Sequence, residues 1–487
     1  MTLADERLRQ LDNPSLTEDE RARLRCRVAA DLIHTGQYEA ARDALGGHWR
    51  GIGERPHVEG LSEATAAEVL LQSGALSGWM DAGGQDAAKD LISESAGIFE
   101  RLGERNRATT ARVELAVCYW REGAYDEARV LLRQASEQVK DDAELKAKTV
   151  MRLALVETSA GRYSDALSLL TESSTLFEES PSHALKGSFH NELAMALQLL
   201  GEAENRQDYL DRAIIEYTAA VYHFAQARHE RYAAAIENNL AFLLYKLGRY
   251  RQAHEQLDRA GAILLRLKDD GLLAQVDETR ARVFLAEKKY GEAARVIARA
   301  VQTLEKGGGP ALLADALTVR GVVRARLGDY EGSISTLRHA IELAEWAGAL
   351  SNAGLAALTL IEEHGARRAL PQKELYQLYL RADELLKETQ DADDVARLRA
   401  CARIVMRRLA DVHLHDKNFT FHGAVHEFEA KLIEQALEEA GGSVTRAARL
   451  LGVSHQTFTT MLNARHKRLL AKRAPPRKRL KSVMKKE

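Results

Sequence analysis

The sequence has few of the residues that stiffen or cross-link a chain. Its 487 residues include only three cysteines and seven prolines. The cysteines, Cys26, Cys118 and Cys401, are far apart and form no CxxC pair, which argues against a disulfide framework or a thiolate zinc site. Scarce proline, together with abundant Leu, Ala, Arg and Glu, favours an all-α fold.

Targeting and catalytic signatures are also missing. The first ten residues, MTLADERLRQ, are charged from Asp5 onward and lack the apolar core of a signal peptide. No apolar run approaches the roughly 18 residues that a membrane helix needs. There is no GxSxG, no GxxxxGK[ST] and no dinucleotide fingerprint after a strand. We therefore expect a cytoplasmic protein that is not an enzyme and needs no cofactor.

Charge is distributed unevenly along the chain. The net charge is −2, yet the stretch from Arg465 to Glu487 holds 11 Lys or Arg and one acidic residue, a net charge of +10. The rest of the chain therefore carries −12. A strongly basic segment of this kind often contacts nucleic acid. The alternative is a disordered end that keeps the protein soluble.

A short pattern, G-x-Y-x-x-A, recurs along most of the sequence. Its copies are GQYEAA at Gly36, GAYDEA at Gly123, GRYSDA at Gly161, GRYRQA at Gly248, and the variants KKYGEA at Lys288 and GDYEGS at Gly328. Successive tyrosines are 38, 40 and 40 residues apart, apart from two gaps of 87 residues that each fit two units. Degenerate copies lie at Tyr209 and in residues 82–102. A constant period of this length indicates a solenoid of repeats.

Small residues accompany each copy at constant spacing. The small residue of the pattern is followed by an apolar residue at +4 and a small one at +7, as in Ala128, Leu132 and Ala135. Another small residue lies seven positions before the glycine position, at Ala29, Ala116, Ala154, Ala241, Ala281 and Gly321. These spacings place the residues on single helix faces. The sequence therefore predicts close-packed helix hairpins that bury their apolar faces by stacking.

The pattern resembles the tetratricopeptide (TPR) repeat in its long form of roughly 40 residues. The resemblance covers residues 15–347, about eight units, after an N-terminal lead of residues 1–14. Two units are degenerate, and the GGGP sequence ending at Pro310 is expected to form a loop. Residues 348–412 are predicted to add three capping helices, with Pro371 in the first turn of one of them.

The TPR resemblance implies an α-solenoid whose concave face binds a peptide or another protein. Asn238 and Asn239, in the first helix of one unit, are candidates to hold a peptide backbone through amide hydrogen bonds. Two alternatives remain open at this point. Both asparagines can be solvated, and the repeats can serve only as a scaffold that orients their ends.

The character of the sequence changes after Val412. Residues 413–421, HLHDKNFTF, have no helical period and are predicted to form a linker. A helix is predicted from His422 to Ala440, capped by Thr420 and ended by a glycine pair. Its apolar stripe consists of Val425, Phe428, Leu432, Ala436 and Leu437.

Two shorter predicted helices follow this one. Ser443 is expected to cap the first and Ser454 the second, with a tight turn at Gly452 between them. The small Ala448 allows the two helices to cross closely, and Phe458 fills the space between them. This arrangement predicts a helix-turn-helix. The alternative is a further packing element of the solenoid.

The stretch LIEQALEEAGGSVTRAARLLGVSHQTFTTML resembles the Fis-type helix-turn-helix, which also occurs at the C terminus of NtrC-like activators. We therefore assign residues 422–470 to this module and residues 471–487 to a basic tail. The resemblance implies a homodimer, often paired through the first helix, and a major-groove recognition helix, here Ser454 to Arg465. No AAA+ ATPase motif is present, so the NtrC activator mechanism does not carry over.

The predicted recognition helix departs from the usual pattern because it has no Lys or Arg before Arg465. Gln456 and Asn463 can pair with adenine, and Thr459 can contact a thymine methyl. Ser443, Thr445 and Arg446 are expected to approach phosphates. Most of the electrostatic attraction is expected from Arg465, Lys467, Arg468 and the tail that follows them. The full set predicted to contact DNA is Ser443, Thr445, Arg446, Ser454, His455, Gln456, Thr457, Thr459, Thr460, Asn463, Arg465, His466, Lys467, Arg468, Lys472 and Arg473.

Four histidines, His413, His415, His422 and His426, fall within 14 residues. The last two have the i, i+4 spacing that can bind zinc. No HExxH motif is present, and the composition fits a solvated linker, so we predict no metal.

Two hypotheses follow. In the first, the protein is a DNA-binding transcriptional regulator whose repeats bind a peptide or protein and whose helix-turn-helix binds DNA as a dimer. In the second, it is a TPR scaffold whose basic tail docks on nucleic acid or an acidic partner without reading sequence. Sequence-specific DNA binding distinguishes them.

Overall fold

The computed structural model describes residues 15–34, 36–80, 85–139, 141–307, 309–367, 369–387, 389, 391–410 and 420–472. Within these ranges every regular element is a helix, as the sequence predicts. The chain divides into two compact units, residues 1–405 and 406–487, which are described separately. No helix of the described part is long and apolar enough to span a bilayer.

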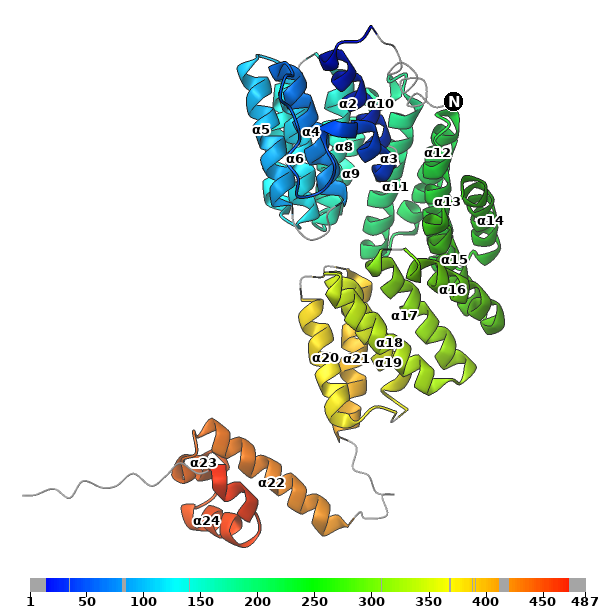
Figure 1. Ribbon diagram of the computed structural model, residues 1–487. Coiled ribbons are helices and arrows are strands. Elements are labelled where there is room, and N and C mark those ends of the chain that lie inside the picture. Colours follow the sequence, from blue (N-terminus) through cyan, green and yellow to red (C-terminus); the bar gives the residue numbers. More distant parts are fainter. Residues whose placement is uncertain are drawn as a thin grey trace, which may run out of the picture. The chain divides into compact units, whose positions relative to one another are not determined.

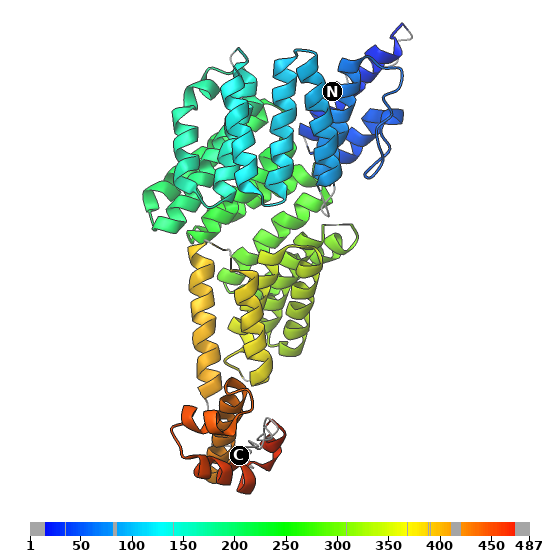
Figure 2. The same ribbon diagram turned by 90° about the vertical axis from the view of Figure 1, so that its left-hand side faces the viewer.

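In the first unit, consecutive helices pack against one another from the first to the penultimate (Figures 1 and 2). They are α2 (Glu18–His34), α3 (Tyr38–Leu45), the 3-10 helix η1 (Gly46–His48), α4 (Glu63–Met80), α5 (Asp86–Arg101), α6 (Arg105–Arg121), α7 (Tyr125–Gln138), α8 (Ala143–Ser159), α9 (Tyr163–Glu172), α10 (Ser174–Glu178), α11 (His183–Glu204), α12 (Gln207–Gln226), α13 (Glu230–Lys246), α14 (Tyr250–Leu267), α15 (Asp270–Ala286), α16 (Tyr290–Glu305), α17 (Pro310–Leu327), α18 (Tyr330–Trp346), α19 (Leu350–His364), α20 (Gln372–Leu385) and α21 (Ala392–Ala410).

The repeated tyrosines mark the same point in each hairpin. Helices α3, α7, α9, α14, α16 and α18 all begin at the tyrosine of the pattern. The glycine two residues earlier has a φ between +71° and +88° in five copies, and Lys288, at +61°, takes its place in the sixth. A left-handed residue at this point ends the first helix and reverses the chain. The predicted hairpins are confirmed.

Small residues allow the two helices of a hairpin to approach closely. Ala116 on α6 and Ala128 on α7 are both fully buried. On α17 the equivalent position is Gly321, where an added Cβ would lie 2.5 Å from Cγ of Leu337. Because that separation is far below van der Waals contact, only glycine fits there without a shift of the leucine.

The first helices of successive hairpins contact one another in two runs. Contacts join α2 to α4, α4 to α6, α6 to α8 and α8 to α11, and again α13 to α15, α15 to α17 and α17 to α19. Within the described residues no comparable contact joins the second helices, such as α5 and α7 or α14 and α16. A stack whose first helices lie closer together than its second helices curves toward the first helices. We call the concave surface formed by these first helices the inner row.

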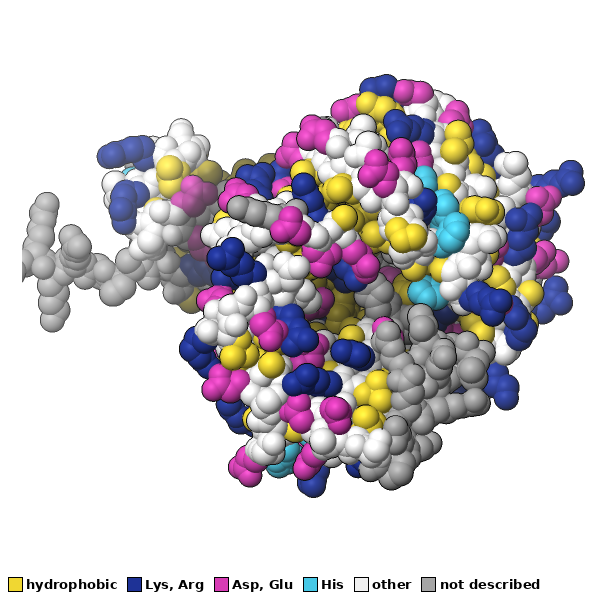
Figure 3. All heavy atoms as spheres, turned by 90° about the horizontal axis from the view of Figure 1, so that it is seen from above, with side chains coloured by type: hydrophobic (Ala, Val, Ile, Leu, Met, Phe, Trp, Pro, Cys, Tyr) yellow, Lys and Arg dark blue, Asp and Glu magenta, His cyan; other side chains and the backbone are white. Residues whose placement is uncertain are grey.

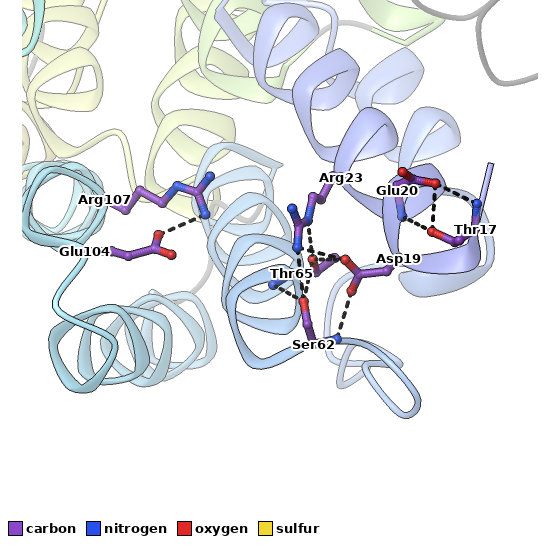
Figure 4. Close-up of polar contacts among 8 residues, drawn as sticks. All are labelled: Thr17, Asp19, Glu20, Arg23, Ser62, Thr65, Glu104 and Arg107. Carbon is purple, nitrogen blue, oxygen red and sulfur yellow. Dashed lines mark hydrogen bonds and ion pairs between the residues drawn. The ribbon is translucent and has the colours of Figure 1, made fainter.

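Polar contacts tie the first hairpin to the second (Figure 4). Asp19 on α2 accepts hydrogen bonds from the Ser62 N–H at 2.8 Å and from the Thr65 hydroxyl at 2.9 Å. Arg23 donates to the same Thr65 hydroxyl at 2.7 Å and pairs with Asp19 at 2.9 Å. These contacts fix the start of α4 on α2, across a connection that contains η1.

Helices α19, α20 and α21, the last of which runs past the boundary of the unit at Val405, lie in the region for which three helices were predicted. Pro310 is the first residue of α17, with Gly309 as its N-cap. Pro371 was predicted inside a first turn, but it occupies the N-cap position of α20 with φ −58° and ψ 145°. Because this ψ is extended, the helix begins one residue later, at Gln372.

The second unit contains α22 (Phe421–Glu439), α23 (Val444–Leu450), α24 (His455–Ala464) and the 3-10 helix η2 (Lys467–Lys472). The predicted cap of α22 is confirmed, because the Thr420 hydroxyl accepts from the Gly423 N–H at 3.0 Å. Residues 413–419 of the predicted linker lie outside the described residues. One apolar core joins the four elements through Ala430, Ile433, Ala436, Leu437, Ala440, Ala447, Ala448, Phe458, Leu462 and Leu469.

Candidate nucleic-acid interface

The turn between α23 and α24 is built as the sequence predicts. Gly452 has a φ of +66°, which reverses the chain directly after α23. Ser454 caps α24, since its hydroxyl accepts from the Thr457 N–H at 3.0 Å. Ser443 occupies the N-cap position of α23, but its side chain makes no capping hydrogen bond.

Two residues hold the angle between the helices. Ala448 is 2% exposed, and Phe458 is completely buried. Both belong to the core of the second unit, together with Leu462 at the end of α24. Because α24 buries this face against α22 and α23, its opposite face is fixed outward.

The outward face of α24 carries polar side chains. His455, Gln456, Thr457, Thr460 and Asn463 are exposed, and Thr459 is partly exposed. The hydroxyls of Thr459 and Thr460 donate to carbonyls one turn earlier, at 2.8 and 2.9 Å, so the methyl groups remain available. The amides of Gln456 and Asn463 have no partner among the described residues. Their i, i+7 spacing places them two turns apart on one side of the helix, where amides can read adenine.

Positive charge near α24 comes from residues that follow or precede it. Lys467 and Arg468 are exposed on η2. Arg465 is also exposed and lies 3.6 Å from a carboxylate oxygen of Glu429. Arg473 and the rest of the tail lie outside the described residues. On the face of the first unit seen in Figure 3, basic and acidic side chains are interspersed rather than segregated.

Helix α23 contributes one cation that the sequence reasoning missed. Thr445 and Arg446 are exposed as predicted, but the Arg446 guanidinium donates to the Ala440 carbonyl at 2.8 Å. Arg449, one turn later, is exposed and has no ion pair among the described residues. Its i, i+3 spacing from Arg446 was the available signal.

Two of the predicted DNA contacts are used inside the unit instead. His466 is only 1% exposed, its Nε2 lies 3.0 Å from Glu429, and its ring packs against the ring of His426 at 4.3 Å. Lys472 pairs with Glu434 and Glu438 on α22, and the hydrogen bonds that its ammonium group donates to these carboxylates raise its pKa. Both residues therefore fasten the end of the unit to its first helix.

The remaining candidates from the sequence fall in separate places. In the inner row, the Asn238 side-chain oxygen is buried without a hydrogen-bond partner, whereas Asn239 is exposed. His413 and His415 lie outside the described residues. Among the described residues no three His, Cys, Asp or Glu side chains converge as metal ligands.

One buried Ser–His contact has the atoms of a catalytic pair but not its setting. The Ser333 hydroxyl lies 2.8 Å from Nε2 of His364 and donates to the Gly321 carbonyl at 2.7 Å. Both side chains are completely buried, and burial lowers the pKa of His364. No substrate reaches such a pair, so it serves as a packing hydrogen bond between α17, α18 and α19.

Comparison with family models assigns three parts of the chain. Residues 106–179 and 314–345 match tetratricopeptide repeats, and residues 424–460 match the bacterial regulatory protein Fis family. The protein thus combines an α-solenoid of TPR repeats with a Fis-type helix-turn-helix, in agreement with both resemblances. The first module is built of tetratricopeptide repeats, and the second is of a DNA-binding family.

Solved structures give similarities over most of the chain at low identity. BtubC (BKLC) from P. vanneervenii is 20% identical, with 51% of this chain and 92% of that chain covered and a TM-score of 0.36. The Rap protein complexed with competence and sporulation factor is 16% identical, with 76% and 100% covered and a TM-score of 0.46. The yeast Tom70 is 13% identical, with 85% and 86% covered and a TM-score of 0.46. No curated protein matches the sequence.

Proposed function

We propose that this protein is a DNA-binding transcriptional regulator of the cytoplasm, with no catalytic activity and no cofactor. Its Fis-type module binds DNA as a dimer, and the inner row of its TPR solenoid binds a peptide or protein. The observation that carries the proposal is the Fis-type fold around an α24 whose outward amides, Gln456 and Asn463, have no partner among the described residues. The three free cysteines, all buried, fit a reducing compartment.

The DNA-binding part is tested by selection of full-length protein on a random DNA pool at near-physiological salt. We expect a two-fold symmetric motif, and we expect it to disappear when Gln456 and Asn463 are both changed to Ala. Each bidentate amide–adenine contact contributes about 1–3 kcal/mol of discrimination. Gln252→Ala, an exposed amide in the first unit, is the matched control and should leave the motif intact.

A different result identifies the scaffold alternative, which the lack of Lys and Arg in α24 favours. Binding without any enriched motif, lost on deletion of residues 473–487, would mean that the tail is a sequence-blind anchor. Under the regulator proposal, six phosphate contacts would give a slope of about −5 in log affinity against log salt.

Dimerisation is proposed to use the exposed side of α22. Only part of the predicted apolar stripe of this helix is buried: Ala436 and Leu437 belong to the core. The other three side chains, of Val425, Phe428 and Leu432, are 50%, 63% and 40% exposed. Their spacing of three and four residues aligns them along one line of the helix. Three large apolar side chains in line on a polar domain are typical of a covered surface.

We expect Phe428→Glu to convert the dimer to a monomer and to weaken operator binding by more than tenfold, since both half-sites are then bound independently. Sedimentation or light scattering at micromolar concentration measures the mass. Glu427→Lys changes a charge on the adjacent residue, which faces another side of the helix, and should leave the dimer intact. A wild-type protein that is monomeric with and without DNA would contradict the dimer.

A further inference from the structure

Two arginines of the inner row lie over one tryptophan. The guanidinium carbons of Arg121, at the end of α6, and Arg152, on α8, lie 5.1 and 6.0 Å from the centre of the Trp79 ring. Trp79 is near the end of α4, so three successive first helices meet here. Neither arginine has an ion pair among the described residues. The positive charge of these two guanidinium groups is therefore not neutralised by a salt bridge within the described residues.

The first residue of α3, Tyr38, packs against the same tryptophan. The Tyr38 ring stacks on Trp79 at 5.9 Å with an interplanar angle of 10°. Burial raises the pKa of the Tyr38 hydroxyl, and Arg121, Arg231 and Arg152 all act to lower it. Arg231, on α13, is already paired with Asp269 at 2.6 Å. The available positive charge is thus that of Arg121 and Arg152.

The nearby carboxyl groups balance this charge only in part. Glu114 on α6 and Glu192 on α11 flank Arg152, and neither is within ion-pair distance of it. Burial raises the pKa of both carboxyls, to about 7 for Glu192. Close to neutral pH a large fraction of Glu192 is therefore protonated and uncharged.

Unpartnered polar atoms lie on the first helices α11 and α13. An oxygen of Glu192, and the amide oxygens of Asn191 and Asn238, are buried and accept no hydrogen bond. Buried polar atoms are normally satisfied, so these three leave acceptor capacity unused on the first helices. The N–H groups of an extended peptide are the donors that amide oxygens would accept from.

A second group of arginines on the inner row is largely paired with carboxylates. A cavity of about 220 Å³ between α2, α4 and α6 is lined by Arg23, Arg27, Ala64, Glu68, Leu71, Arg107 and Thr110. Arg23 is held by Asp19 and Thr65, and Arg107 pairs with Glu104 at 2.9 Å (Figure 4). Because Asp19 and Glu104 already neutralise two of the three arginines, and Glu68 adds a further carboxyl group to the lining, the cavity offers an anion less than the Trp79 cluster does.

We propose that Arg121 and Arg152 bind a carboxylate of the ligand above Trp79, with the ligand backbone running over Asn191 and Asn238. The ligand is thus a peptide that carries a carboxylate, either at its C terminus or on an Asp or Glu side chain. Arginine is suited to this role because its planar fork can donate two hydrogen bonds to one carboxylate. This inference rests on the proposed peptide-binding function of the inner row.

The test selects ligands from an array of random heptapeptides with full-length protein. Enriched peptides are resynthesised as the free acid, as the C-terminal amide, and with Asp and Glu replaced by Asn and Gln. We expect one carboxylate whose removal weakens binding by about tenfold or more. The form that loses affinity shows whether the terminal or a side-chain carboxylate is bound.

Three variants tie the effect to this site. Arg152→Met should weaken binding of the free acid by a similar factor, and should have little further effect on the peptide that already lacks the carboxylate. Glu192→Gln should strengthen binding at pH 8, which a damaged fold would not do, because it removes the competing negative charge. Arg133→Met, an exposed arginine on the second helix α7, is the matched control.

The outcomes separate the two proposals. If no peptide is enriched by the wild-type protein, peptide binding and the carboxylate site both fall. If peptides are enriched but bind equally well without a carboxylate, or if Arg152→Met and Glu192→Gln leave their affinity unchanged, peptide binding stands and the assignment to Arg121 and Arg152 is overturned.

Discussion

Replacing Phe458 with alanine is expected to unfold the helix-turn-helix and abolish DNA binding while the solenoid stays folded. Phe458 is completely buried in a core of ten residues. Truncation of a buried phenylalanine costs about 3–5 kcal/mol. A unit of this size has little stability to lose, since small domains bury a modest fraction of their surface.

Hydrogen exchange followed by mass spectrometry measures this effect in the full-length protein. Amides of α23 and α24 should lose their protection, whereas those of α13 to α18 should keep it, because the two units have separate cores. The control is Leu450→Ala on α23, in which the truncated side chain is 57% exposed and lies outside the core of its own unit. Preserved protection of α24 in the Phe458 variant would show that the unit does not depend on this ring.

The hairpins could be predicted from the sequence because their signals are local. A glycine that permits positive φ, followed two residues later by the tyrosine that begins a helix, is a pattern of a few residues repeated at constant spacing. The degenerate copy at Tyr209, where α11 and α12 form the hairpin, shows the limit of this signal. There Asn205, with a φ of +54°, is the C-cap of α11. Gly201 lies inside the helix, where an added Cβ would lie 2.9 Å from the Leu210 side chain. Packing rather than turn geometry selects that glycine.

The candidate DNA interface could be predicted in part. The helical period alone places Gln456 and Asn463 on the face opposite Phe458, and the structure agrees. The burial of His466 could not be predicted, because it lies among charged residues and its partner Glu429 is 37 residues away in the chain. The Trp79 cluster was missed for the same reason. Tyr38, Trp79, Arg121 and Arg152 share no motif and meet only because the hairpins stack.

Two equivalent positions in successive hairpins are expected to respond to substitution in opposite ways. Asp277 on α15 is 3% exposed, and both of its oxygens accept from Arg299 on α16, at 2.6 and 2.7 Å. One repeat earlier, 40 residues back in the sequence, Glu237 is 4% exposed and lies near the exposed Arg259. Its Oε2 atom has no hydrogen bond among the described residues. Burial raises the pKa of Glu237 from 4.5 to about 7, an effect that Arg259 only partly offsets.

Glu237→Gln should therefore stabilise the solenoid at pH 8 and change little at pH 4.5. Because the folded state of the wild type binds the Glu237 proton more tightly, its free energy of unfolding falls as pH rises from 4.5 to 7. The change in pKa corresponds to about 3 kcal/mol above pH 7, which glutamine avoids because it does not titrate. Asp277→Asn should instead destabilise by about 1–3 kcal/mol at pH 8, since it weakens two charge-assisted hydrogen bonds.

Denaturant unfolding of both variants and the wild type at several pH values between 4.5 and 8 measures these differences. Because repeats can unfold in segments, hydrogen exchange of α13 to α16 is followed in the same samples, with α19 as an internal reference. A gain in stability for Glu237→Gln that is the same at pH 4.5 and pH 8 would mean that side-chain packing, and not the buried charge, separates this hairpin from the next. A gain confined to neutral and basic pH would instead show that the buried Glu237 carboxylate destabilises its hairpin. Asp277 avoids this cost because Arg299 donates two hydrogen bonds to its carboxylate, whereas Arg259 offsets the burial of Glu237 only in part.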